Sequence, residues 1–112
     1  MPQQPSYIAE RVNELIKREL VLLLSTGTKD PRLKDVIITD VIVSRDLTSA
    51  KVFFSIDDES HNDVSHLLNK ASGFFRSSLS KALDLRHTPS LNFIYDTAPN
   101  TGARMDDLLN QL

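Results

Sequence analysis

Residues 36–57, VIITDVIVSRDLTSAKVFFSID, decide the fold because they contain two predicted strands and the turn between them. Residues 36–43 are rich in β-branched side chains, which favour a strand. Residues 49–57 alternate between apolar and polar side chains, the pattern of a strand with one buried face. The short polar link at 44–48 therefore predicts an antiparallel hairpin.

Side-chain parity predicts which face of each strand is buried. Asp40 should point to solvent, which gives the first strand a core face of Ile37, Thr39, Val41 and Val43. The second strand should bury Ala50, Val52, Phe54 and Ile56. Phe53 points the other way, either as cover for a neighbouring strand, which we favour, or as a small exposed contact patch.

Helices are predicted on both sides of this hairpin. Residues 6–25 have an apolar stripe at helical spacing, with Ser6 as the expected N-cap. The stripe consists of Ile8, Val12, Leu15, Ile16, Leu20 and Leu23. Residues 63–84 repeat the pattern but are interrupted at Gly73, which costs about 1 kcal/mol relative to alanine inside a helix. Gly73 therefore marks either a tolerated position or a bend.

Residues 90–96 predict a third strand, and residues 103–112 could form a last amphipathic turn or two. The element order is thus helix, strand, strand, broken helix, strand. It predicts an α+β fold, with a three-stranded mixed sheet in the order 1-2-3 and helices packed on one face. A length of 112 residues favours one domain over 1–112, with 1–5 as a flexible N-terminus and 97–112 as a short C-terminal segment.

The composition excludes several kinds of site. The absence of cysteine rules out disulfides and thiolate zinc sites, and three glycines are too few for a phosphate-binding glycine loop. His61 and His66 do not share a helix face, and His87 stands alone. We therefore expect no metal, no cofactor, no small-molecule substrate and no catalytic residue. No apolar run reaches the ~18–20 residues of a membrane helix, and no secretion signal is visible, so a cytoplasmic location is expected.

Charge is distributed unevenly along the chain. The net charge is −2, but residues 1–34 carry +2, residues 35–69 carry −5, residues 70–95 carry +3 and residues 96–112 carry −2. Such a pattern predicts a basic face, although solvated surface charge is the simpler interpretation. The candidate cations are Arg11, Arg18, Lys29, Arg32, Lys34, Lys70, Arg76, Lys81, Arg86 and Arg104. Arg11 and Arg18 should share a helix flank, as should Lys70 and Lys81 if their helix is straight.

Several motifs, in their order and spacing, are together specific to one family. They are Asp30-Pro31-Arg32-Leu33, residues 38–41, 43–47 and 50–55, Ala71-Ser72-Gly73, residues 86–91, and Gly102-Ala103-Arg104-Met105-Asp106. Over residues 6–112 the chain resembles the bacterial ribosome-binding factor A family.

This resemblance implies a type II KH fold, in which an Ala-x-Gly helix kink replaces the usual G-x-x-G loop. Ala71, Ser72 and Gly73 match that kink. The resemblance also implies a non-enzymatic factor that binds the 30S ribosomal subunit and influences the processing and folding of 16S rRNA. We also expect the protein to be a monomer. A role in cold adaptation and a ribosome-assembly GTPase as a partner are further implications.

Two other functions stay open from the residues alone. One is a small protein-interaction or dimerisation domain. The other is a generic KH domain for single-stranded RNA, which should stack bases on exposed aromatic side chains. Only Phe53, Phe74, Tyr7 or Tyr95 could serve in that role.

Overall fold

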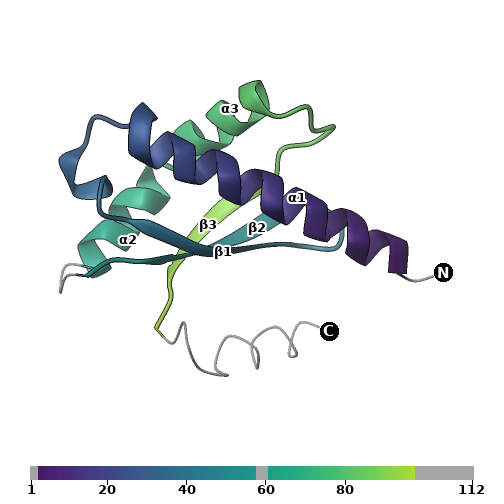
Figure 1. The fold of residues 1–112 in the computed structure, drawn as a ribbon, viewed down its shortest axis with the longest axis horizontal. Helices are drawn as coiled ribbons and strands as arrows, with labels where there is room; N and C mark the ends of the chain where they lie inside the picture. Colours follow the sequence, from purple (N-terminus) through teal and green to yellow (C-terminus); the bar gives the residue numbers. More distant parts are fainter. Residues whose placement is uncertain (1–2, 58–60, 98–112) are drawn as a thin grey trace.

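A kinked pair of helices and one long helix lie on the same side of a three-stranded sheet (Figure 1). The computed structural model describes residues 3–57 and 61–97. Its helices are α1 (Gln3–Leu22), α2 (His61–Lys70) and α3 (Ser72–Ala82), and its strands are β1 (Ile37–Val43), β2 (Ser49–Ser55) and β3 (Ser90–Tyr95). The predicted element order and the α+β fold are confirmed. The turns expected at 103–112 lie outside the described residues.

The sheet has the predicted order β1-β2-β3 and is mixed. β1 runs antiparallel to β2, with Val41 opposite Val52, and β3 runs parallel to β2, with Val52 opposite Phe93. α1 packs on β1, while α2 and α3 pack on β3. The core therefore forms between one face of the sheet and the helices.

The predicted core face of β1 is wrong at its start. Ile38 pairs with Phe54 and Asp40 pairs with Phe53, so Thr39 is an extra residue in a β-bulge. The bulge reverses the side-chain parity, and Ile38 is buried while Ile37 is 62% exposed. Beyond the bulge, Val41 and Val43 are buried as predicted.

Polar contacts from two distant elements hold this bulge. The Thr39 hydroxyl donates to Oδ2 of Asp96 over 2.7 Å, and Nζ of Lys17 donates to the Thr39 carbonyl over 3.3 Å. β2 needs no such correction, because all four residues expected on its core face are buried. Phe53 on the opposite face is only 6% exposed, which excludes an exposed contact patch there.

The first helix differs from prediction at both ends. It begins at Gln3, so Ser6 is inside the helix and is not its N-cap. Its regular part ends at Leu22, and a wider π-helical turn continues over Leu23–Gly27. Ile16 and Leu20 on the apolar stripe are fully buried, whereas Leu15 is 39% exposed at the edge of the stripe.

The interruption in the second helical pattern is a bend, and it is centred on Ala71. Ala71 has φ −92° and ψ 9°, outside the helical region, and separates α2 from α3. Its N–H donates to the carbonyls of both Leu67 and Leu68, at 3.1 and 3.2 Å. Gly73 lies within α3 and has no positive φ. The bend is therefore made without a backbone conformation that requires glycine.

Gly73→Ala should consequently stabilise the protein, by about 0.5–1 kcal/mol. An added Cβ would meet no atom within 4 Å, and alanine loses less backbone entropy on folding. Thermal denaturation should show a rise of roughly 2–8 °C in the midpoint. Gly27→Ala is the control with the smaller gain, because its Cβ would lie 3.2 Å from Leu23. A fall in the midpoint of Gly73→Ala would mean that the bend does require glycine.

Candidate nucleic-acid interface

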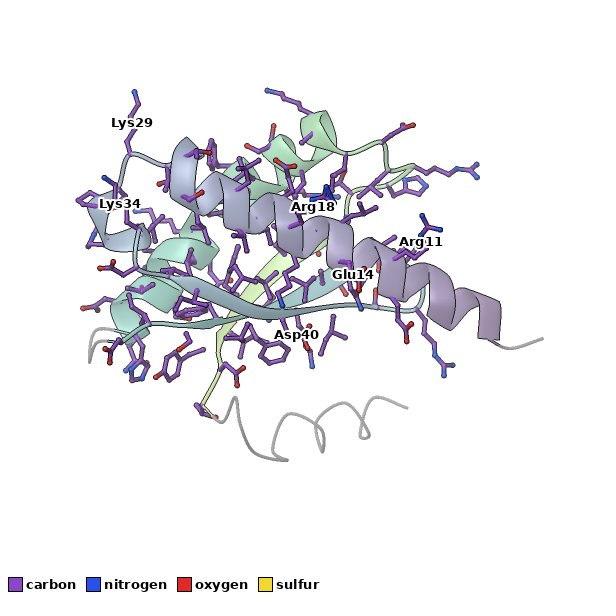
Figure 2. The ribbon with its side chains drawn as sticks, viewed as in Figure 1. Arg11, Glu14, Arg18, Lys29, Lys34 and Asp40 are labelled. Carbon is purple, nitrogen blue, oxygen red and sulfur yellow. The ribbon has the colours of Figure 1, made fainter. Side chains whose placement is uncertain are left out.

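The predicted basic residues are distributed over separate parts of the surface (Figure 2). Arg11 and Arg18 lie on α1, whereas Lys29, Arg32 and Lys34 lie in the loop between α1 and β1. Lys70, Arg76 and Lys81 lie on α2 and α3, and Arg86 follows α3. All nine are exposed, and Arg104 lies outside the described residues. They fall into three groups, on α1, in the loop before β1, and on α2, α3 and the segment after α3.

The α1 group is electrostatically balanced. Arg11 and Arg18 share a flank as predicted, and with Glu14 and Leu15 they line a shallow hollow of about 200 Å³ (Figure 2). The helix carries three cations (Arg11, Lys17 and Arg18) and three carboxylates (Glu10, Glu14 and Glu19). Since opposite charges are interspersed there, this flank offers little net attraction to a polyanion.

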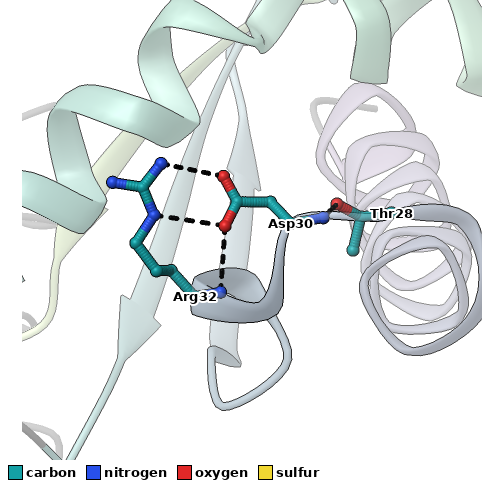
Figure 3. A network of polar contacts seen from close by, with 3 residues as sticks. All are labelled: Thr28, Asp30 and Arg32. Atoms are coloured by element: carbon teal, nitrogen blue, oxygen red, sulfur yellow. Dashed lines mark hydrogen bonds and ion pairs between the residues drawn. The ribbon is translucent and has the colours of Figure 1, made fainter.

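The loop group loses one cation to an internal contact (Figure 3). Nε and Nη2 of Arg32 donate to the two carboxylate oxygens of Asp30, at 3.2 and 3.0 Å. The same carboxylate caps the Pro31–Leu33 turn by accepting the Arg32 N–H at 3.0 Å, and Thr28 Oγ1 accepts the Asp30 N–H at 3.3 Å. Arg32 therefore holds this turn together, which leaves Lys29 and Lys34 as the outward-facing cations of the loop (Figure 2).

This pairing makes the turn sensitive to acid. The hydrogen bonds from the Arg32 side chain and backbone lower the pKa of Asp30, and the contact with Asp30 raises the pKa of Arg32. A carboxyl group with a lowered pKa stabilises the folded state above its ordinary pKa of about 3.9. That contribution is lost as the pH falls through the lowered value, so the turn is fully held at neutral pH.

The helices α2 and α3 carry the largest excess of cations over carboxylates among the three groups. We call residues 61–82 the α2–α3 arm. It contains Lys70, Arg76 and Lys81, and its one carboxylate is Asp63 in the first turn. Across the described residues, no ion pair involves these three cations. The bend at Ala71 means that Lys70 and Lys81 belong to two differently directed helices, so the straight helix on which their shared face depended is absent.

Arg76 also has a structural contact. Its Nε donates to the carbonyl of Thr88 over 3.0 Å, which ties α3 to the segment before β3. The acceptor is a neutral carbonyl, so the guanidinium keeps its full charge at the surface. Lys70 and Lys81 have exposed side chains at the last turns of α2 and α3.

The four candidate aromatic side chains differ in how exposed they are. Phe53 is buried, and Tyr95 is half-buried, stacked on His61 with ring centroids 4.1 Å apart. Tyr7 lies where side chains are not described. Phe74 on α3 is 51% exposed. Among the described aromatic side chains, Phe74 alone is open to a stacking partner.

Other kinds of site find no support in the described part of the chain. Residues 3–57 and 61–97 contain no group of three metal-ligating side chains. No helix within those residues is long and apolar enough to cross a membrane.

Known proteins match this chain over nearly its whole length. The sequence profile of ribosome-binding factor A matches residues 8–109. The chain belongs to the ribosome-binding factor A family. A relative named ribosome-binding factor A, from Vesicomyosocius okutanii, is 63% identical over 110 residues, which are 98% of this chain and 96% of the relative.

Solved structures of ribosome-binding factor A have the same fold. The crystal structure from Thermus thermophilus matches with a TM-score of 0.71 at 22% identity, covering 78% of this chain and 93% of the other. Coordinates of a homology model of the Thermus thermophilus factor, fitted into a cryo-EM map of a 30S complex with that factor, match with a TM-score of 0.57 at 21% identity. They cover 77% of this chain and 97% of the other.

Membership of the ribosome-binding factor A family agrees with the geometry of the α2–α3 arm. The matched range includes every described strand and the bend at Ala71. A single residue joins α2 to α3, so the arm has no room for a glycine-rich KH loop between its helices. Any contact with nucleic acid at this place must therefore come from the helix surfaces.

Proposed function

We propose that this protein binds the 30S ribosomal subunit and acts in its maturation, influencing the processing and folding of 16S rRNA. The observation that carries the proposal is the α2–α3 arm, with three cations and one carboxylate, in a chain whose net charge is −2. A polyanion is attracted by a local positive surface even when the net charge is negative. The 30S complex of the Thermus thermophilus factor supports the choice of the small subunit.

The proposed action is binding without chemistry. Lysine and arginine side chains that neutralise phosphates release counterions, so binding should weaken linearly with the logarithm of salt concentration. We extend the proposal to a monomeric, non-enzymatic factor that needs no cofactor and works in the cytoplasm. We further propose that a ribosome-assembly GTPase releases the protein from the subunit and that the protein acts in cold adaptation. The GTPase partner and the role in cold adaptation rest on the family resemblance.

Co-sedimentation with purified ribosomal particles tests the proposal. The protein should pellet with 30S subunits and much less with 70S ribosomes, since a maturation factor has to leave before subunits join. Raising the salt concentration should release it. Equal binding to both particles, or binding to neither, would overturn the proposal.

A dimerisation domain is the second candidate, and exposed apolar side chains on α1 favour it. Leu15, Val21 and Leu22 are 39%, 47% and 53% exposed. If a second copy covers them, sedimentation velocity should show a mass that rises with protein concentration. Leu22→Ala would then weaken the dimer. A monomer mass at every concentration would exclude this candidate.

A further inference from the structure

We propose that Phe74 is a stacking platform for an unpaired RNA base, and that Lys81 on the same face of α3 binds a phosphate of the same strand. This inference rests on the proposed function, because it names the part of the ribosomal RNA that the α2–α3 arm would recognise. It commits to single-stranded RNA as the ligand.

The Phe74 side chain contacts a core residue on one side and is half exposed to solvent. It makes an edge-to-face contact with Phe75, with centroids 5.3 Å apart and the ring planes at 68°. Phe75 is 1% exposed and anchored in the core, so it limits the movement of its neighbour. Phe74 itself is 51% exposed. This contact restricts the ring and leaves one face accessible to a base. Stacking a base on it would therefore cost little side-chain entropy.

The face of α3 around Phe74 has the composition of a nucleotide site. Residues seven apart lie on one helix face, so Lys81 follows Phe74 along the axis at about 10 Å. Ser77 and Ser78 occupy the two positions between them, three and four residues after Phe74. The stripe thus offers a π surface, hydroxyl groups and an ammonium group. Base stacking and phosphate contacts use these groups.

The charge around this stripe favours RNA over a protein ligand. α3 contains no carboxylate, and Lys70 at the end of α2 adds a further cation. A partner protein that recognised an apolar patch would need more than one large apolar side chain, and Phe74 is the one exposed large apolar residue of the described arm. Duplex RNA would not suit either, since its bases are stacked on each other.

The direct test is binding to an unstructured RNA of about ten nucleotides that contains one 2-aminopurine, whose fluorescence falls when it stacks. The wild-type protein should bind and quench it. Phe74→Ala should bind roughly 5- to 150-fold more weakly and lose the quenching. Phe74→Trp should retain both, whereas Phe74→Leu, which is apolar but has no π surface, should resemble Phe74→Ala. Lys81→Gln should flatten the log–log salt dependence by about 0.7.

Ile37→Ala is the matched control, because Ile37 is an exposed large apolar residue at the start of β1, outside the α2–α3 arm. It should bind RNA like the wild type, and thermal denaturation should show all variants folded. Unchanged binding by Phe74→Ala, or full binding by Phe74→Leu, would overturn the inference. So would a wild-type protein that ignores the free RNA. If that protein still pellets with 30S subunits, the proposed function stands and the stacking site alone fails.

Discussion

Phe75→Ala should lower the free energy of unfolding by about 3–5 kcal/mol, the usual cost of removing a buried aromatic ring. Phe75 is 1% exposed and packs against Phe93 of β3, with ring centroids 5.4 Å apart. It lies four residues after Ala71, so it is the first core residue of α3 beyond the bend. Removing the ring would leave a cavity between the α2–α3 arm and the sheet. Urea denaturation would measure the loss of unfolding free energy.

Phe74→Ala is the matched control, one residue away. Because Phe74 is 51% exposed, the same substitution should change the stability by about 0.5 kcal/mol or less, apart from its edge contact with Phe75. The pair therefore tests the orientation of α3 about its own axis. Similar losses of stability for the two variants would show that α3 is rotated from the position described above.

The Lys70→Gln/Lys81→Gln double variant should bind 30S subunits about 25- to 60-fold more weakly at 0.1 M salt. Each phosphate contact contributes roughly 0.7–0.9 to the log–log salt slope, so the loss of two contacts should flatten that slope by about 1.4–1.8. Both lysines are exposed and lie in the last turns of their helices, where a cation interacts favourably with the helix dipole, so the melting midpoint should fall by a few degrees at most. Binding of labelled protein to 30S subunits over a range of salt concentrations would measure both effects.

Arg11→Gln/Arg18→Gln is the control with the same change in charge. Glu14 lies in the hollow that the two arginines line, so their removal should cost less binding than removal of the two lysines. A larger loss of 30S binding in the arginine variant would show that α1, and not the α2–α3 arm, contacts the RNA. If neither double variant weakens binding at any salt concentration, Lys29 and Lys34 in the loop become the next candidates (Figure 2).

Local sequence patterns determined the element order and most of the core. Strict alternation predicted the buried face of β2 correctly, because Ser49 to Phe54 pair with β3 without a bulge. The interruption at residues 71–73 left a bend and a tolerated glycine both open, and the structure shows a bend at Ala71. Helical spacing also carried the signal for Phe74: Phe75 and Leu79 lie four residues apart on the buried face, which leaves Phe74 outside. The absence of carboxylates from α3 was equally visible in the sequence.

The buried face of β1 and the pairing of surface charges depend on contacts that form only in the folded structure. Thr39 forms a bulge that reverses the buried parity of β1, and its partners Lys17 and Asp96 lie 22 and 57 residues away along the chain. No local pattern contains that information. The Arg32–Asp30 ion pair joins residues only two positions apart, but it forms because the Pro31–Leu33 turn brings the carboxylate within 3.0 Å of the guanidinium. The sequence determined which residues are charged or apolar, whereas the tertiary structure decided which charges are already paired, because pairing depends on the close approach of atoms in space.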